Sequence, residues 1–169
     1  RGLGDVYKRQ VQGPAVGLGV AILCYSDIVY CAEKSLFSVP FTALGLSPEF
    51  GLTYCLCEKA GSKKAMEKLL LSEPISTQEA LQMGIVTSIF KDEDVLKETL
   101  ARAARLTKLP LGSLRGTKAL LRHHQGQAIR DAMKAEEAVL IERLQSDEAR
   151  EACQAFEEGR KPDFSACSH

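Results

Sequence analysis

The stretch VQGPAVGLGVAILCYSDIVYCA, residues 11–32, decides the fold of this 169-residue chain. Its first part, from Gly13 to Gly19, is a glycine-rich turn that leads into a helix of small apolar residues, predicted from Leu18 to about Cys24. Its last part, Ile28–Ala32, is rich in β-branched and aromatic residues and predicts a strand. This alternation favours an α/β architecture over a helix bundle or a β-sandwich.

The rest of the chain continues the alternation and then becomes helical. Leu36–Val39 and Ile85–Phe90 predict two more strands, and Ser47 followed by Pro48 predicts a helix from Pro48 toward Cys57. Glycine, proline and capping residues delimit the other predicted helices, which are Lys63–Leu71, Thr77–Met83, Glu93–Leu106, Leu111–His123, Gln127–Leu144 and Asp147–Glu158.

Three segments organise the chain. Residues 1–10 lack an initiator Met, a targeting pattern and hydrophobic periodicity, so we interpret them as a non-native leader to an N-terminally truncated protein. Residues 11–108 form a partial α/β core, and residues 109–169 form a helical region.

Composition limits the classes of partner. The chain is 45% hydrophobic, which is enough to bury a core, and its 22 Lys plus Arg residues balance 22 Asp plus Glu. No net charge favours nucleic acid or an anionic membrane surface. The longest apolar stretch, Ala15–Leu23, is too short to span a bilayer. We therefore expect a soluble protein without nucleic-acid or membrane partners.

The six cysteines predict free thiols rather than a metal or redox site. Most lie inside apolar runs, and no Cys-x-x-Cys pair is present. Cys55 and Cys57 are the one close pair, but no second pair or nearby His completes a ligand set. We expect buried free thiols in a reducing compartment, and no metal. Residues 166–169 do not match a Ser-Lys-Leu address, so a cytoplasmic location fits, with peroxisome and mitochondrion left open.

Two features carry candidate chemistry. The glycine-rich turn points backbone N–H groups of the following helix at an anion or a developing oxyanion, although its glycines also suit tight helix–strand packing. Glu49, within Ser47–Gly51, is a carboxylate flanked by apolar residues and glycines, as a base beside a carbonyl requires. The alternative for Glu49 is a plain capping role, because an acid in the first turn of a helix stabilises it by ~0.3–1 kcal/mol.

The order and spacing of several segments from Val11 to about Asp163 resemble the enoyl-CoA hydratase/isomerase (crotonase) superfamily. These segments are Val11–Gly19, Asp27–Lys34, Phe37, Gly45, Ser47–Glu49, Ala80–Val86 and Arg160–Phe164. The resemblance implies a crotonase-like spiral of β-β-α turns, partial in this chain, and a C-terminal helical region that makes trimers. It also implies an acyl-CoA thioester substrate, no other cofactor, and a homotrimer or hexamer for the full-length protein.

The resemblance also assigns site residues. Leu18 falls where the family places one of the two backbone N–H donors of its oxyanion hole, and the other donor comes from an upstream segment that this chain does not contain. With half an oxyanion hole, the chain as given is expected to be nearly inert. The residues expected to bind the substrate are Ala15, Gly17, Gly19, Phe41, Leu46 and Phe50.

Within that resemblance, the hydratases use two glutamates at positions that here are Ala21 and Phe41, so hydration is disfavoured. The peroxisomal and mitochondrial Δ3-Δ2-enoyl-CoA isomerase branch carries one glutamate in a Ser-Pro-Glu segment, which here is Glu49. This base would move a proton between C2 and C4 of an unsaturated fatty acyl-CoA. Since a helix N-terminus favours a charged carboxylate, this reading requires desolvation by Leu46, Phe50 and Phe41.

Two rival functions stay open. One is another crotonase reaction on an acyl-CoA, with Glu49 as the base. The other is a non-catalytic corepressor module like the chromodomain-Y-like proteins, which resemble the same branch but carry Asp at the position of Glu49.

Other polar residues are weaker candidates. We interpret His123 and His124 as a solvated helix end. Arg115, Lys118 and Arg122 recur on a helix that the family folds toward bound CoA, so each is a candidate phosphate contact or, more simply, solvated surface.

Overall fold

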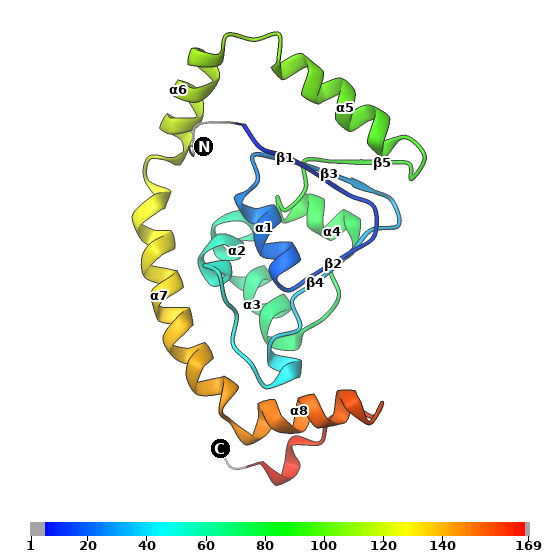
Figure 1. The fold of residues 1–169 in the computed structure, drawn as a ribbon, viewed down its shortest axis with the longest axis vertical. Helices are drawn as coiled ribbons and strands as arrows, with labels where there is room; N and C mark the ends of the chain where they lie inside the picture. Colours follow the sequence, from blue (N-terminus) through cyan, green and yellow to red (C-terminus); the bar gives the residue numbers. More distant parts are fainter. Residues whose placement is uncertain (1–5, 168–169) are drawn as a thin grey trace.

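Two small parallel sheets form the centre of the protein in this computed structural model, which describes residues 6–167 (Figure 1). One sheet has the strand order β1-β3-β5, and the other pairs β2 with β4. In the larger sheet Val11 faces Cys31, and Cys31 faces Ile89 on its other side. The strands are β1 (Lys8–Val11), β2 (Pro14–Val16), β3 (Ile28–Ala32), β4 (Leu36–Ser38) and β5 (Ser88–Phe90).

Helices surround the sheets and make up the second half of the chain. They are α1 (Leu18–Tyr25), α2 (Leu52–Ala60), α3 (Ser62–Leu71), α4 (Thr77–Gln82), α5 (Val95–Leu106), α6 (Leu111–Arg122), α7 (Gln125–Leu144) and α8 (Asp147–Glu157), with 3-10 turns η1 (Thr42–Leu44) and η2 (Phe164–Ala166). This arrangement confirms the predicted α/β class.

The main core lies between α1, the sheets and α2–α4. Its largest fully buried side chains include Phe37 of β4, Leu52 and Leu56 of α2, and Ile75, which bridges to Phe37. Burying each such side chain stabilises the fold by ~1.5–3 kcal/mol. The core therefore fixes α1 and α2, the two helices that border the candidate site.

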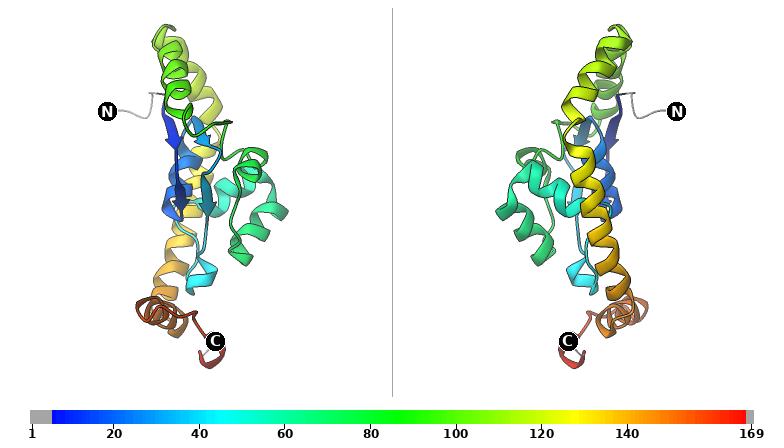
Figure 2. Two further views of the ribbon diagram at one scale, coloured as in Figure 1. Left: turned by 90° about the vertical axis from the view of Figure 1, so that its right-hand side faces the viewer. Right: turned by 90° about the vertical axis from the view of Figure 1, so that its left-hand side faces the viewer.

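Helices α6 and α7 run along one side of this core, and α8 turns beneath it (Figures 1 and 2). α7 packs against α2, and α8 packs against η1. Close packing at η1 is visible in Gly45, where a Cβ atom would lie 2.7 Å from the Glu148 backbone. None of the described helices combines the length and apolar character needed to cross a membrane.

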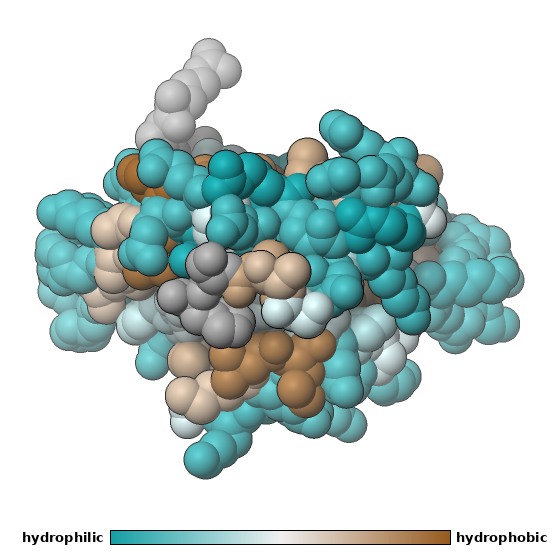
Figure 3. Space-filling model, turned by 90° about the horizontal axis from the view of Figure 1, so that it is seen from below, coloured by the Kyte–Doolittle hydropathy of each residue, from teal (hydrophilic) through white to brown (hydrophobic). Residues whose placement is uncertain are grey.

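An apolar patch interrupts the polar surface at the lower end of the molecule (Figure 3). The exposed leucines at this end include Leu44 of η1 and Leu70 and Leu71 of α3. The two elements meet there because the Thr42 hydroxyl donates hydrogen bonds to the Leu69 and Leu70 carbonyls, at 3.0 Å each. Apolar side chains thus remain uncovered at this end of the described chain.

Most predicted elements are present with small shifts at their ends, and three regions differ more from the prediction. β2 lies inside the stretch predicted as a turn, because pairing with β4 makes a strand of only three residues. β5 begins at Ser88 rather than Ile85, since the Ile85 and Val86 N–H groups donate to Ala80 O at the end of α4. The predicted helix from Pro48 is wrong at its start, because α2 begins at Leu52.

The domain bounds of the sequence stay a prediction. Residues 8–11 form β1, so the proposed boundary between residues 10 and 11 falls inside a strand. Residues 1–5 of the proposed leader lie outside the described residues. The boundary near residue 108 coincides with the turn between α5 and α6.

Candidate active site

The turn between β2 and α1 is the first part of the site. Gly17 adopts φ 53° and ψ −112°, a conformation that a side chain would oppose. Its N–H donates to Ser38 O at 2.8 Å, and its carbonyl accepts from Val20 N at 3.0 Å and Ala21 N at 3.2 Å. The turn is therefore tied to β4 on one side and to the first helical turn on the other.

Leu18 begins α1, and its amide is available to a ligand. Among the described residues no backbone acceptor is recorded for the Leu18 or Gly19 N–H, which are the first two of the helix. The Leu18 side chain is 42% exposed, so this end of α1 is not buried under other described elements. The role of the Leu18 amide in an oxyanion hole stays a prediction.

Apolar side chains stand at the two positions where the family resemblance predicts the hydratase glutamates. Ala21 is 1% exposed and Phe41 is 8% exposed, so both belong to the core. Phe41 lies against the glycine turn, since a Cβ atom on Gly17 would be 3.7 Å from Phe41 Cζ. Ala15 packs on the same turn, 3.7 Å from the Cβ position of Gly19. No acid–base group is supplied at these positions.

Glu49 lies in the loop before α2 and not in the first turn of that helix. Phe50 and Gly51 follow it with φ values of 67° and 71°, so the backbone is left-handed for two residues and the helix starts only at Leu52. The Glu49 side chain is part-buried, and its carbonyl accepts from Leu52 N at 3.2 Å. The capping role in a first turn therefore does not apply to Glu49.

Ser47 is not the cap of α2 either. Its Oγ is buried and has no hydrogen-bond partner among the described residues. The N-terminal N–H groups of α2 are instead bound by the carboxylate of Glu136 on α7, which accepts from Gly51 N and from Thr53 N at 2.8 Å. The sequence predicted Ser47 as the N-cap because capping rules consider only residues next to the helix. They do not include a residue as distant in the chain as Glu136.

Tyr25 holds the same loop from the other side. Its hydroxyl, at the end of α1, donates a short hydrogen bond to the carbonyl of Phe50, and the two rings meet edge to face at 6.0 Å. Burial, followed by a hydrogen bond with Cys55, raises the pKa of Tyr25 well above its usual range. The phenol thus stays protonated as a donor.

The expected apolar wall around Glu49 is only partly formed. Leu46 is part-buried and packs against the core, as Phe41 does. Phe50 is 46% exposed, so within the described residues it does not desolvate the loop as the sequence predicted. Its backbone is left-handed, with φ 67°, a conformation that the sequence did not predict.

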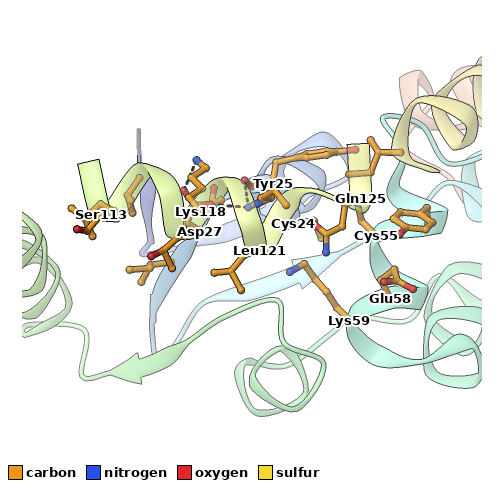
Figure 4. A pocket seen from close by; sticks show the side chains of 18 of the residues that line it. Cys24, Tyr25, Asp27, Cys55, Glu58, Lys59, Ser113, Lys118, Leu121 and Gln125 are labelled. Carbon is orange, nitrogen blue, oxygen red and sulfur yellow. Dashed lines mark hydrogen bonds and ion pairs between the residues drawn. The ribbon is translucent and has the colours of Figure 1, made fainter. Parts of the chain in front are cut away.

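Lys118 and Arg122 of α6 are ion-paired rather than solvated. Both bind Asp27, which follows α1, at 2.7 Å and 2.9 Å (Figure 4). Arg122 also donates to Tyr25 O at 2.9 Å. Burial raises the pKa of Asp27, but the hydrogen bonds from Lys118 and Tyr7 outweigh it and lower the pKa overall. The expectation of solvated surface is wrong for these two residues.

Two cavities border this ion pair. One, of about 640 Å³, is lined by residues of α1, α2 and α6 that include Cys24, Cys55 and Lys118 (Figure 4). The other, of about 490 Å³, is lined by Ile22, Phe50 and Ile129 among others. Glu49 and Leu18 line neither cavity. The larger cavity therefore lies at the opposite end of α1 from the Leu18 amide.

The thiols and the histidines add no chemistry to the site. Cys24, Cys31 and Cys55 are buried free thiols, and burial raises the pKa of Cys24 to about 12. Cys153 is exposed on α8, which corrects the prediction for that residue. His123 and His124 are exposed at the α6–α7 junction, as expected. Within residues 6–167 no group of three or more candidate metal ligands is assembled.

Comparisons with known proteins identify the family of this chain. Residues 9–166 match the sequence model of the enoyl-CoA hydratase/isomerase family. The chain is 35% identical over 146 residues to "Enoyl-CoA delta isomerase 2" of Rattus norvegicus, covering 86% of this chain and 37% of that protein. It is 32% identical over 154 residues to a "Probable enoyl-CoA hydratase" of Rhodobacter capsulatus, covering 91% of this chain and 60% of that protein.

A solved structure supports the same assignment. The crystal structure of an enoyl-CoA hydratase/isomerase from Pseudoalteromonas atlantica superposes with a TM-score of 0.87 at 33% identity, covering 92% of this chain and 63% of that one. The fold is thus crotonase-like, and the chain spans less than two thirds of each relative named here. From the family match and the shared fold together, the chain belongs to the enoyl-CoA hydratase/isomerase family.

Proposed function

We propose that the complete protein carrying this chain is a Δ3-Δ2-enoyl-CoA isomerase of unsaturated fatty acyl-CoA, with Glu49 as its single base. The observation that carries this proposal is the buried, apolar character of Ala21 and Phe41 beside the Leu18 turn. Water activation by two carboxylates has no support there, whereas Glu49 lies on a loop that Tyr25 and Glu136 both hold. The similarity to an isomerase supports the same choice.

The proposed mechanism is a proton shuttle. The Glu49 carboxylate takes a proton from C2 of a 3-enoyl-CoA, and the C–H electron pair moves into a dienolate whose oxygen accepts a hydrogen bond from Leu18 N–H. The carbonyl then reforms, a double bond forms between C2 and C3, and the former C3–C4 double bond takes the proton from Glu49 at C4. The proton count is unchanged, and no cofactor is needed beyond the CoA of the substrate.

Substrate binding and assembly are parts of the same proposal. Ala15, Gly17 and Gly19 would line the thioester end, with Phe41, Leu46 and Phe50 near the reacting carbons. The mechanism needs a second oxyanion donor besides Leu18 N–H, since one N–H donor fewer costs about 10²–10³ in rate. Light scattering of the complete protein would measure whether it forms the trimer or hexamer that the resemblance implies.

The test compares wild type and Glu49→Gln in the complete protein with a 3-enoyl-CoA. We expect the rate of conversion to the conjugated 2-enoyl-CoA to fall by about 10²–10⁴-fold, as when a general base is removed. Glu33→Gln is the matched control, because Glu33 is an exposed acid on the β3–β4 turn. Equal turnover by wild type and Glu49→Gln would remove Glu49 from the mechanism.

A panel of acyl-CoA thioesters separates the rivals. Formation of a 3-hydroxyacyl-CoA from a 2-enoyl-CoA would favour a hydratase over an isomerase. Absence of turnover with every thioester, together with recovery of chromatin enzymes in a pull-down, would favour the corepressor alternative.

A further inference from the structure

Helix α2 lacks a cap of its own at the end that carries the Glu49 loop. Its N-cap residue, Gly51, has no side chain to accept a hydrogen bond, and its first turn contains no acidic residue. The first N–H groups of a helix need acceptors, and the positive end of its dipole favours an anion. The sequence near α2 supplies neither.

Glu136 supplies both from a remote helix. Glu136 is 6% exposed, and its carboxylate accepts hydrogen bonds from Gly51 N, Thr53 N and the Thr53 hydroxyl, the last two at 2.8 Å and 2.5 Å. Glu136 lies on α7, 85 residues after Gly51, and α7 runs beside α2 (Figure 1). A buried carboxylate with three donors is a fixed contact, since hydrogen bonds to charged groups are roughly twice as strong as neutral ones.

The residues between Glu49 and the Glu136 contact link the position of Glu136 to that of the Glu49 backbone. Gly51 is the second residue after Glu49, and both Phe50 and Gly51 have positive φ. The Phe50 carbonyl accepts from the Tyr25 hydroxyl and the Gly51 N–H donates to Glu136, so the Phe50–Gly51 peptide unit, one residue after Glu49, is bound from α1 and from α7. Movement of either partner would move the Glu49 backbone.

We propose that Glu136 is a positioning residue for Glu49, through which helix α7 of the C-terminal region sets the placement of the base. This inference rests on the proposed function, because it assumes that Glu49 reacts. Glu136 does not contact the substrate in this account. It acts by binding the end of α2.

The principal test is Glu136→Gln in the complete protein, assayed with a 3-enoyl-CoA well below the unfolding temperature. Glutamine keeps the shape but replaces one acceptor oxygen with an NH₂ donor, which must face Gly51 N–H or the Thr53 donors. We expect kcat to fall roughly 10- to 100-fold with KM within about twofold, since a misplacement of about 1 Å can slow a reaction to this extent. Glu137→Gln, the exposed neighbour on α7, is the matched control and should keep wild-type kcat.

A double-mutant cycle separates positioning from a purely structural role. If Glu136 acts through Glu49, Glu136→Gln should not slow the residual turnover of Glu49→Gln further, because the two effects share one pathway. A structural role would lower the unfolding temperature but leave kcat unchanged in the folded variant. If Glu136→Gln does not fold, Thr53→Val takes its place, with about a threefold or greater loss of kcat expected and Thr53→Ser restoring it.

The outcomes also distinguish this inference from the proposed function. No turnover by wild type, or equal turnover by Glu49→Gln, overturns the proposed function and this inference with it. An active wild type and an inactive Glu49→Gln, with folded Glu136→Gln or Thr53→Val at wild-type kcat, overturns the role of Glu136 alone.

Discussion

Gly51 has a left-handed backbone, and other side chains lie close to the place where a Cβ atom would stand. Its φ is 71°, and a Cβ atom would lie 2.5 Å from Tyr25 Oη and 3.4 Å from side-chain atoms of Ile129 and Met133. Both α1 and α7 would have to shift to admit one carbon. At this residue the need for glycine follows from strain and packing together.

We therefore expect Gly51→Ala to lower the free energy of unfolding by ~1–3 kcal/mol, the range for a residue forced into a sparsely populated backbone region. Urea denaturation measures the change. Gly112→Ala is the control, because Gly112 lies in α6 with no atom within 4 Å of its Cβ position. That substitution should leave stability unchanged or raise it by up to ~1 kcal/mol. Equal effects of the two substitutions would show that the Gly51 contacts are unimportant.

Sequence reasoning at this scale found the residues but not their backbone. The glycine turn at Gly17 and the start of α1 at Leu18 are where the sequence placed them, whereas Glu49 lies in a loop before α2; their roles in a site stay a prediction. The positive φ of Phe50 was not predicted from the sequence, since the peptide group that follows it is bound by residues far along the chain: Tyr25 Oη donates to Phe50 O, and Gly51 N donates to the Glu136 carboxylate. No local sequence pattern identifies Tyr25 or Glu136 as a partner of this loop. Glu136 is one of several acidic residues on a long helix, and nothing in the sequence distinguishes it from the others.

At the scale of elements, α4 begins with a capping box formed by Ser76 and Glu79, and this box also binds α3. The Glu79 carboxylate accepts from Ser76 N and Ser76 Oγ, at 2.9 Å each, and from Lys68 at 2.8 Å. Lys68 is a buried lysine of α3 that also donates to Pro74 O at 3.2 Å. The Ser76–Glu79 spacing revealed the box, whereas the contact with Lys68 depends on how the two helices pack.

This contact predicts a pH-dependent stability. The hydrogen bond from Lys68, followed by those from Ser76, lowers the pKa of Glu79 from 4.5 to about 2. A lowered pKa in the folded state means that the stabilisation is complete above pH 4.5 and is lost as the pH falls toward about 2. Glu79→Gln should therefore lower the free energy of unfolding by ~1–2 kcal/mol at neutral pH, with a smaller difference below pH 4.5.

Urea denaturation at a series of pH values checks this prediction. Glu67→Gln is the control, because Glu67 forms an exposed pair with Lys64 on the same helix and should change stability little. A difference between wild type and Glu79→Gln that stays constant across the acidic range would contradict the assigned pKa direction.

At the scale of the molecule, two polar contacts attach the C-terminal helices to the core. Asp27 binds Lys118 and Arg122 of α6, and Glu136 of α7 binds the start of α2. The composition predicted a helical region after residue 108, but not its place along α1 and α2. Docking of a helix depends on its polar partners as well as on its apolar face, and those partners are 83 or more residues away in the chain.

Because α6 and α7 follow each other with only His123 and His124 between them, either contact alone should keep both helices near the core. We expect Asp27→Asn to lower the free energy of unfolding by about 2 kcal/mol, as for loss of hydrogen bonds to charged groups, while α6 and α7 keep their protection from hydrogen exchange. Asp27→Asn combined with Glu136→Gln should remove both attachments. Amides of α6 and α7 should then exchange well before those of β3, since separate regions open with separate free energies.

Hydrogen exchange measured by mass spectrometry on the complete protein tests this prediction, with Glu137→Gln in place of Glu136→Gln as the control double variant. If α6 and α7 keep wild-type protection when both carboxylates are replaced, apolar packing and the remaining Arg122 hydrogen bond to Tyr25 O hold the C-terminal region on the core, and α7 is attached to α2 without the carboxylate of Glu136.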